Sequence, residues 1–262
     1  MAVGRTAPPD RVAADGSPYP DRTRPTFERD VQLMFTYIAQ RYDWFDHVAS
    51  MGNDFLWRPR ALWQLERFLT EHNVRRILDV GCGTGDLTRL AARHFPQALV
   101  VGADFTSAML AKADRRIGRP PERARIEFDR ASALHLPFRA EKFDLVMSAF
   151  VARNLPDLPA AFRELRRVLR PGGIAMTLEI TEPNDPWFRG LFHAYFDRVV
   201  PWLGAAVRSA GPYRYLPESL KSLPSREAML RLFESTGFSR FEAHPQSMGI
   251  VTTYLAEAGA RG

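Results

Sequence analysis

The chain has 262 residues, 45% of them hydrophobic and 25% charged, which is the composition of one globular domain with a sizeable core. The sequence has no apolar secretory signal and no run of the roughly 18 apolar residues that span a membrane. Cys82 is its only cysteine, so it cannot form an intramolecular disulfide. We therefore expect a cytoplasmic protein. The net charge of +6 comes mostly from scattered arginines, so it excludes a basic nucleic-acid-binding tail without selecting a partner.

The N-terminal part of the chain precedes the main pattern. Residues 1–26 are rich in proline, arginine and aspartate, and we expect them to form a disordered tail. Helical spacing of apolar residues begins at Phe27, and a second helix is predicted around Leu62, Leu65 and Phe68. We therefore predict an N-terminal helical cap over residues 27–72 of a single domain that runs from 27 to 258.

Strand-like and helix-like segments then alternate. The predicted strands are residues 75–80, 98–104, 125–132, 143–150 and 172–180, and the predicted helices are 86–95, 107–117 and 158–169. Such alternation implies parallel strands joined by right-handed crossovers, and hence a doubly wound α/β sheet.

The C-terminal part follows a different pattern. A helix is predicted over 225–238, with Ser225 as its cap and Gly237 as its stop. Two strands at 239–245 and 248–256 follow, close enough in the sequence to pair as an antiparallel unit.

A glycine-rich loop joins the first of these strands to its helix. The segment ILDVGCGTGDLTRL places Gly81, Gly83 and Gly85 at the carboxyl end of the strand, where open sheets bind ligands and helix N–H groups are free. The pattern G-x-G-x-G differs from the dinucleotide fingerprint G-x-G-x-x-G. It also lacks the lysine of a phosphate-binding P-loop.

Two acids flank this predicted ligand site. Asp79 at the end of the first strand disfavours a pyrophosphate and suits a ligand with a positive charge, either an ammonium or a sulfonium. Asp104 at the end of the second strand is suited to accept hydrogen bonds from two ribose hydroxyls. Its structural alternative is the N-cap of the next helix.

Several segments are similar to the successive motifs of class I S-adenosylmethionine-dependent methyltransferases: ILDVGCGTGDLT, GADFTSAML, ALHLPF, FDLVMSAF and LRRVLRPGG. The chain resembles most closely the demethylmenaquinone and ubiquinone C-methyltransferases, through RYD, ARN and YRYLPES, over residues from about 30 to 254. The resemblance implies a Rossmann-like sheet of seven strands, mostly parallel, with an antiparallel last strand, N-terminal helices and a helical lid after the fifth strand. It implies S-adenosylmethionine as cofactor. The substrate would be a reduced polyprenyl quinone, methylated on a ring carbon to give menaquinol or its ubiquinol-pathway equivalent.

The resemblance also assigns cofactor contacts. It places Gly81, Gly83 and Thr84 at the methionine end of the cofactor and Asp104 at its ribose, with Asp79 and Gly85 completing the loop.

The resemblance also assigns residues to the adenine and to the sulfonium end of the cofactor. Ser132 and Ala133 would flank the adenine, but the family usually has Asp or Asn where this chain has Ser132. A serine still accepts a hydrogen bond from the adenine amine, without charge assistance. Ala149 occupies a position that is often serine and offers no polar side chain.

Methylation of a ring carbon requires a neighbouring hydroxyl to lose its proton. A phenol pKa near 10 is too high at neutral pH, and a shielded guanidinium would lower it by about one to three units. Arg153 is the candidate, with a surface pair to Asp157 as the alternative. Asn154 would orient Arg153 or the substrate oxygen, and Tyr42 would close over the cofactor or be a core aromatic. No metal is expected.

A segment rich in apolar and aromatic residues follows the fifth predicted strand. Residues 186–207 place Trp187, Leu191 and Phe192 on one helical face. This is a helix packed on the sheet, a lid that shapes a quinone pocket and rests on the membrane interface, or both. We predict a lid and substrate region over 186–222, with a lipid quinol as substrate and peripheral contact with the inner face of the membrane. No nucleic-acid partner is expected, and a homodimer is left open.

Two other functions stay open. The same fold could methylate another small phenol, a polyketide or a lipid. The chain could also be a non-catalytic methyltransferase-like scaffold of a quinone-synthesis complex, although the intact glycine loop with Asp79 and Asp104 argues against a dead site.

Overall fold

The computed structural model describes residues 20–39, 53–69, 73–118, 121–183, 185–195, 215, 218–220 and 222–260. The sheet in this part of the chain comprises β1 (Arg76–Val80), β2 (Leu99–Asp104), β3 (Ile126–Arg130), β4 (Phe143–Ala149), β5 (Leu169–Ile180), β6 (Phe238–Gln246) and β7 (Val251–Ala258). These seven strands lie in the order β3-β2-β1-β4-β5-β7-β6. β7 is antiparallel to β5 and β6, and the other pairs are parallel. The predicted doubly wound, seven-stranded sheet with an antiparallel C-terminal pair is confirmed.

The α-helices of the described chain are α1 (Phe27–Ile38), α3 (Asp54–Phe68), α4 (Asp86–His94), α5 (Ser107–Arg116), α6 (Leu158–Val168), α7 (Pro186–Ala194) and α10 (Arg226–Ser235). Their ends follow local chemistry. The Ser225 side chain accepts a hydrogen bond from the Ala228 N–H at the start of α10. Gly237, just beyond the end of that helix, has a φ of 94°, a conformation that favours glycine. The predicted cap and stop of this helix are therefore confirmed.

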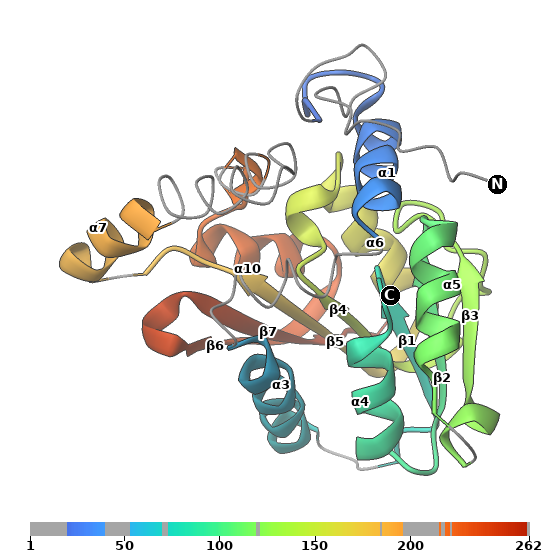
Figure 1. Ribbon diagram of the computed structural model, residues 1–262. Helices are drawn as coiled ribbons and strands as arrows, with labels where there is room; N and C mark the ends of the chain where they lie inside the picture. The colour runs from blue at the N-terminus through green and yellow to red at the C-terminus, as the bar shows by residue number, and fades with distance from the viewer. Residues whose placement is uncertain are drawn as a thin grey trace, which may run out of the picture.

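Helices cover both faces of the sheet (Figure 1). On one face, α3 and α4 pack over a core that includes Leu65 and Ile77, and α5 lies beside them against β2 and β3. On the other face, α6 and α10 contribute Phe162 and Phe233 to a second core that includes Leu78. Neighbouring residues of β1 thus enter opposite cores, which explains why apolar side chains occupy both faces of this strand.

α1 and α7 lie apart from these two layers. α1 contacts α5, and its Phe27, Val31 and Met34 pack with Tyr215. α7 projects at the periphery of the molecule (Figure 1), where Phe192 is buried while 78% of Trp187 is exposed.

Some predicted features lie wholly or partly outside the described residues. They are Tyr42, residues 1–19 of the predicted tail, and most of the predicted lid after residue 195. The lid and the role of Tyr42 therefore stay predictions. The described part of the tail approaches the site, because Arg22 Nη2 donates a hydrogen bond to the Arg153 carbonyl oxygen at 2.6 Å.

Candidate active site

The three glycines of the β1–α4 loop have three different surroundings. All have positive φ, at 68° for Gly81, 54° for Gly83 and 81° for Gly85, so any other residue would be strained. A Cβ on Gly81 would lie 2.4 Å from Val151 Cγ2, in the turn after β4. A Cβ on Gly83 would meet nothing within 4 Å, whereas one on Gly85 would crowd Ala113 of α5 at 3.2 Å. Gly83 thus offers open backbone, while Gly81 and Gly85 allow close packing.

A cavity opens beside this loop, at the carboxyl ends of β1, β2 and β4, and encloses about 650 Å³ of space that is partly open to solvent. The predicted site residues that line it are Gly81, Gly83, Asp104, Ala133, Ala149 and Asn154. Glu28 of α1 and Phe105 at the end of β2 line it as well. The structure therefore brings together glycine loop, acid and alanines that are far apart in the sequence.

Asp104 is held rigidly at the cavity wall. Its Oδ2 accepts the Gly83 N–H at 2.9 Å, and its Oδ1 accepts the Thr106 N–H at 2.8 Å. Burial raises the pKa of Asp104, and these two N–H groups act in the opposite direction. The N-cap residue of α5 is Thr106, so Asp104 supports the start of that helix without capping it. A carboxylate has further lone pairs for ligand hydroxyls.

Asp79 lies beneath the loop instead of at the cavity surface. It is buried, and its Oδ2 accepts a hydrogen bond from Thr88 Oγ1 of α4 at 2.6 Å. Burial raises the pKa of Asp79 to about 7, although Thr88 and the charge of Arg58 oppose this shift. Asp79 would therefore act on a cationic ligand through its electrostatic field and not by direct contact in the cavity.

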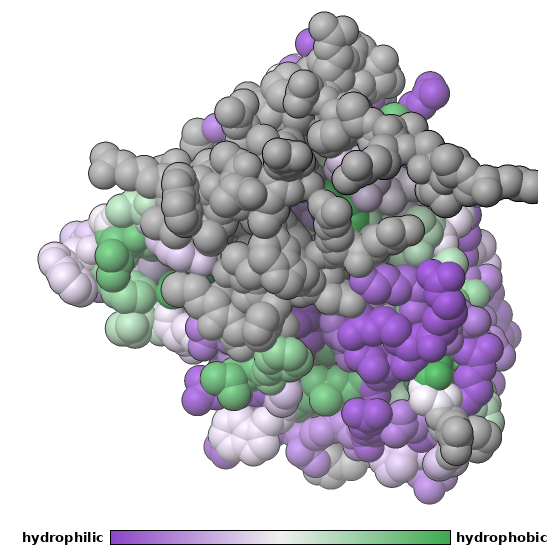
Figure 2. Space-filling model, viewed as in Figure 1, coloured by the Kyte–Doolittle hydropathy of each residue, from purple (hydrophilic) through white to green (hydrophobic). Residues whose placement is uncertain are grey.

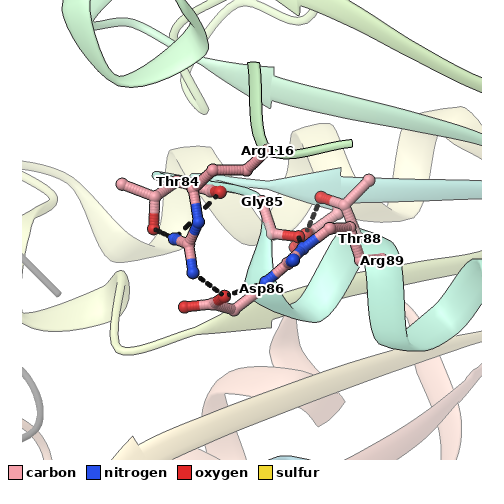
Figure 3. Close-up of polar contacts among 7 residues, drawn as sticks. Thr84, Gly85, Asp86, Thr88, Arg89 and Arg116 are labelled. Atoms are coloured by element: carbon pink, nitrogen blue, oxygen red, sulfur yellow. Dashed lines mark hydrogen bonds and ion pairs between the residues drawn. The ribbon is translucent and has the colours of Figure 1, made fainter. Parts of the chain in front are cut away.

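Thr84 and Gly85 face the polar network behind the loop (Figure 3). Arg116 of α5 donates to Thr84 Oγ1 at 2.8 Å and to Asp86 at 3.0 Å. Arg89 donates to the same Asp86 oxygen at 2.6 Å. This network ties α4 to α5 and holds the loop from behind, so ligand contacts of Thr84 and Gly85 stay predictions.

The turn after β4 carries Arg153 and is fixed by a buried acid that the sequence analysis missed. Glu179 Oε1 of β5 accepts the N–H groups of Val151 at 2.8 Å and Ala152 at 2.7 Å. Burial raises the pKa of Glu179 to about 7, opposed by these N–H groups and by the charge of Arg153. The sequence does carry one signal for Glu179, which is a charged residue within a strand that is otherwise mostly apolar. Asp157, the alternative partner considered for Arg153, caps α6 by accepting the Ala160 N–H.

Asn154 is anchored at the cavity by two contacts. Its Oδ1 accepts the Tyr215 hydroxyl at 3.1 Å, and its Nδ2 donates to the Phe150 carbonyl oxygen at 3.2 Å. Burial raises the pKa of Tyr215 to about 12, although Arg153 and Arg22 act in the opposite direction. Tyr215 thus donates as a neutral phenol, and it links the segment YRYLPES to the predicted ARN segment.

Ser132 lies beyond β3 and is engaged by α1. Its hydroxyl donates to Glu28 Oε1 at 2.5 Å and accepts the Leu134 N–H at 3.2 Å. Ser132 lines a second hollow next to the main cavity, and Glu28 lines both. Glu28 was not predicted as a site residue, because nothing in its own segment marks it.

Comparison with known proteins decides the family. The model of the ubiE/COQ5 methyltransferase family matches residues 24–257. The chain belongs to this family. A relative, the demethylmenaquinone methyltransferase of Thermus thermophilus, is 42% identical over 211 residues, or 80% of this chain and 93% of that protein. The ubiquinone/menaquinone biosynthesis C-methyltransferase UbiE of Geobacter sulfurreducens is 36% identical over 232 residues, 88% and 89% of the two chains.

Solved structures agree on the fold. An S-adenosylmethionine-dependent methyltransferase from Thermotoga maritima superposes with a TM-score of 0.60 at 16% identity, covering 87% of this chain and 99% of that one. The resemblance stated from the sequence is thus confirmed at the level of the ubiE/COQ5 family and its fold.

The cavity fits the cofactor S-adenosylmethionine. Gly83 presents backbone with open space above it, and Asp104 presents an oriented carboxylate for the ribose. Phe105 and Met109 form an apolar wall beside it, as a nucleoside base requires. Gly83, Asp104, Phe105 and Met109 would thus hold the cofactor in this protein.

Proposed function

We propose that this enzyme methylates a ring carbon of a reduced polyprenyl quinone, converting demethylmenaquinol to menaquinol or performing the equivalent step towards ubiquinol. The observation that carries the proposal is the similarity, over most of both chains, to relatives with these named activities, at 42% and 36% identity. S-adenosylmethionine is the cofactor and supplies an electrophilic methyl group when bound.

Different residues of the chain would bind the cofactor and position the substrate. Gly81, Gly83 and Asp104 bind and orient the cofactor on the β1 and β2 side of the cavity. On the β4 side, Asn154 forms the wall, held in place by Tyr215. The substrate ring would lie between these two sides, because proximity and orientation are what a ring carbon needs to attack.

Arg153 is proposed to activate the substrate. Arg153 is buried in the turn after β4 and is not itself among the residues that line the cavity, but its positive charge favours the ionised forms of Glu179 and Tyr215. The same charge would stabilise the phenolate of a quinol at that edge and lower the hydroxyl pKa from about 10 by about one to three units. The ring carbon then becomes nucleophilic at neutral pH.

A lipid substrate also requires access to a membrane. No helix in the described part of the chain is long and apolar enough to cross one. Figure 2 shows apolar surface on α7 and on α3, where Trp187, Leu191 and Phe55 are exposed, while the surface over α4 and α5 is hydrophilic. We propose that α7 contacts the inner face of the membrane peripherally.

Vesicle flotation tests this contact. Trp187→Glu combined with Leu191→Glu should reduce co-flotation with anionic phospholipid vesicles, because both apolar side chains lose their place in the interface. Leu99→Glu at the amino end of β2 is the matched control, since Leu99 is also more than half exposed, at 55%. Equal flotation of all variants would argue against α7 as the contact.

The substrate is tested in cells that lack the protein. Extracted quinones should accumulate in the demethyl form, and the intact gene should restore the methylated quinone. An Asp104→Ala gene should not restore it. An unchanged quinone profile would point to another acceptor, and failure of the purified protein to bind S-adenosylmethionine at millimolar concentration would point to a scaffold.

A further inference from the structure

The sheet order determines which part of a bound cofactor lies over which strand. Parallel β4, β1, β2 and β3 are neighbours, so a ligand that begins at Gly81 after β1 and passes Asp104 after β2 reaches the end of β3 next. Ala131 and Ala133 line the cavity there. The adenine base therefore belongs at the β3 end, where Phe105 lines both the cavity and the hollow beside it.

Ser132 at this end has little capacity left for a base. Its hydroxyl hydrogen is donated to Glu28, and its oxygen already accepts the Leu134 N–H. One acceptor lone pair remains, and it carries no charge.

A carboxylate is nevertheless present. Glu28 comes from α1, 104 positions earlier in the chain, and lies at both the main cavity and the hollow beside Ser132. Its Oε1 accepts the Ser132 hydroxyl at 2.5 Å, which fixes the orientation of the carboxylate. A carboxylate has about four acceptor positions, so this one hydrogen bond leaves others for a ligand.

We propose that Glu28 recognises the base of the cofactor: its carboxylate accepts the hydrogen bond of the adenine 6-amino group, and Ser132 positions it. The pair Glu28–Ser132 thus supplies the charged acceptor that Ser132 alone lacks. A charged acceptor makes a hydrogen bond about twice as strong as a neutral one. The inference rests on S-adenosylmethionine as the cofactor.

The rival role of Glu28 is a tether that only holds α1 over the cavity. The two roles differ in how they treat the base. A tether would affect every nucleoside ligand equally, whereas a base contact would depend on the 6-amino donor. S-adenosylhomocysteine and S-inosylhomocysteine separate them, because the second ligand carries a carbonyl oxygen in place of the amine.

Calorimetric titration of the purified full chain with both ligands is the test. The unaltered protein should prefer S-adenosylhomocysteine by about 10- to 100-fold. Glu28→Gln should reduce this preference at least about tenfold, because a glutamine amide can donate to the carbonyl of the inosine base. Ser132→Ala should reduce it less, and Glu127→Gln, an exposed acid of β3, should leave it unchanged.

Thermal unfolding of each variant without ligand shows whether the fold is intact. Equal weakening of both ligands by Glu28→Gln, or no weakening of either, would overturn the base contact while leaving the cofactor assignment standing. If the unaltered protein binds neither ligand at millimolar concentration, the cofactor assignment fails first and this inference fails with it.

Discussion

Buried carboxylates carry much of the polar chemistry at the carboxyl edge of the sheet, and their surroundings give them different tasks. Asp79, Asp104 and Glu179 each accept hydrogen bonds from nearby N–H or O–H groups, because an unpaired buried carboxylate would be very costly. Only Asp104 of the three lines the cavity. Ligand affinity should therefore respond to Asp104, and local geometry and pH dependence to the other two.

Asp104→Asn should weaken binding of S-adenosylhomocysteine by about 10- to 100-fold, the effect of losing a hydrogen bond to a charged group. The asparagine amide would also face the N–H group of Gly83 or Thr106, where the carboxylate now accepts. Calorimetry gives the dissociation constant, and circular dichroism checks the fold. Unchanged affinity in a folded variant would contradict the ribose role.

Arg153→Ala should lower turnover by about 100-fold or more while changing cofactor affinity by less than about twofold, because its charge is proposed to act on the substrate. Turnover of a short-chain demethylmenaquinol should also rise more steeply with pH in the variant, since the hydroxyl keeps a pKa near 10. Arg163→Ala, an exposed arginine of α6, is the control. Loss of cofactor binding with retained turnover would refute this role.

The residues that a local sequence pattern could predict lie at the ends of recognisable strands or in the loops that follow them. Gly81 and Gly83 share one loop, and Asp104 ends the adjacent strand, so a pattern of strand, glycines and acid is sufficient to find them. Glu28 pairs with Ser132 across 104 positions, and Tyr215 with Asn154 across 61. No local pattern specifies such pairs, because only the folded sheet brings them together.

At the scale of elements, the β1–α4 loop and the turn after β4 form one packed unit. Gly81 leaves no room for a side chain, because its Cβ would lie 2.4 Å from Val151 Cγ2. Gly81→Ala should therefore destabilise the fold by about 2 kcal/mol or more, from overpacking and from the positive φ. Cofactor affinity should fall as the loop shifts.

Val151→Ala added to Gly81→Ala should restore much of the stability and affinity, because it removes both Cγ atoms that the new Cβ would meet. Gly83→Ala is the matched control for stability alone, with positive φ but open space around the Cβ. Thermal unfolding and calorimetry measure both effects. If Val151→Ala rescues nothing, steric contact between the two segments is not what limits position 81.

Element boundaries follow tertiary contacts as much as local preference. The strand predicted from residue 172 begins at Leu169, directly after α6, and pairs there with Phe143 before the register shifts. Met248, predicted inside the last strand, instead lies in a 3-10 turn with a φ of 56°. Next to it, Ser247 accepts a hydrogen bond from the Trp57 indole of α3 at 2.8 Å, a contact that no local pattern predicts.

At the scale of the whole molecule, the alternation of strands and helices was enough to predict the sheet, because right-handed crossovers leave few arrangements open. It also predicted the edge where ligands bind. The placement of α1 over that edge was not predictable, since its apolar face would fit any apolar partner. Its contacts with Tyr215 and Ser132 are what make α1 part of the site.

The buried acids also give the molecule a characteristic pH dependence. Burial raises the pKa of Asp79 and of Glu179 to about 7, so each binds a proton in the native state at pH values where it is ionised in the unfolded chain. The native state therefore takes up protons between about pH 4 and 7, and these two groups' contribution to the free energy of unfolding falls as the pH rises through that window. The change is at most about 4 kcal/mol for Asp79 and about 3 kcal/mol for Glu179.

Glu179→Gln isolates this effect, because glutamine keeps an acceptor oxygen for the Val151 and Ala152 N–H groups but cannot ionise. Relative to the unaltered protein, the variant should gain stability as the pH rises from 5 to 8, measured by urea unfolding at each pH. Glu164→Gln is the control, because the pKa of Glu164 is shifted in the opposite direction. A hydrogen bond from Arg167 lowers it, so the contribution of Glu164 to the free energy of unfolding is lost only as the pH falls below about 4.5. Its difference from the unaltered protein should be flat between pH 5 and 8. A flat difference for Glu179→Gln as well would mean that Glu179 is ionised throughout this range and that the Arg153 turn is held by a full negative charge.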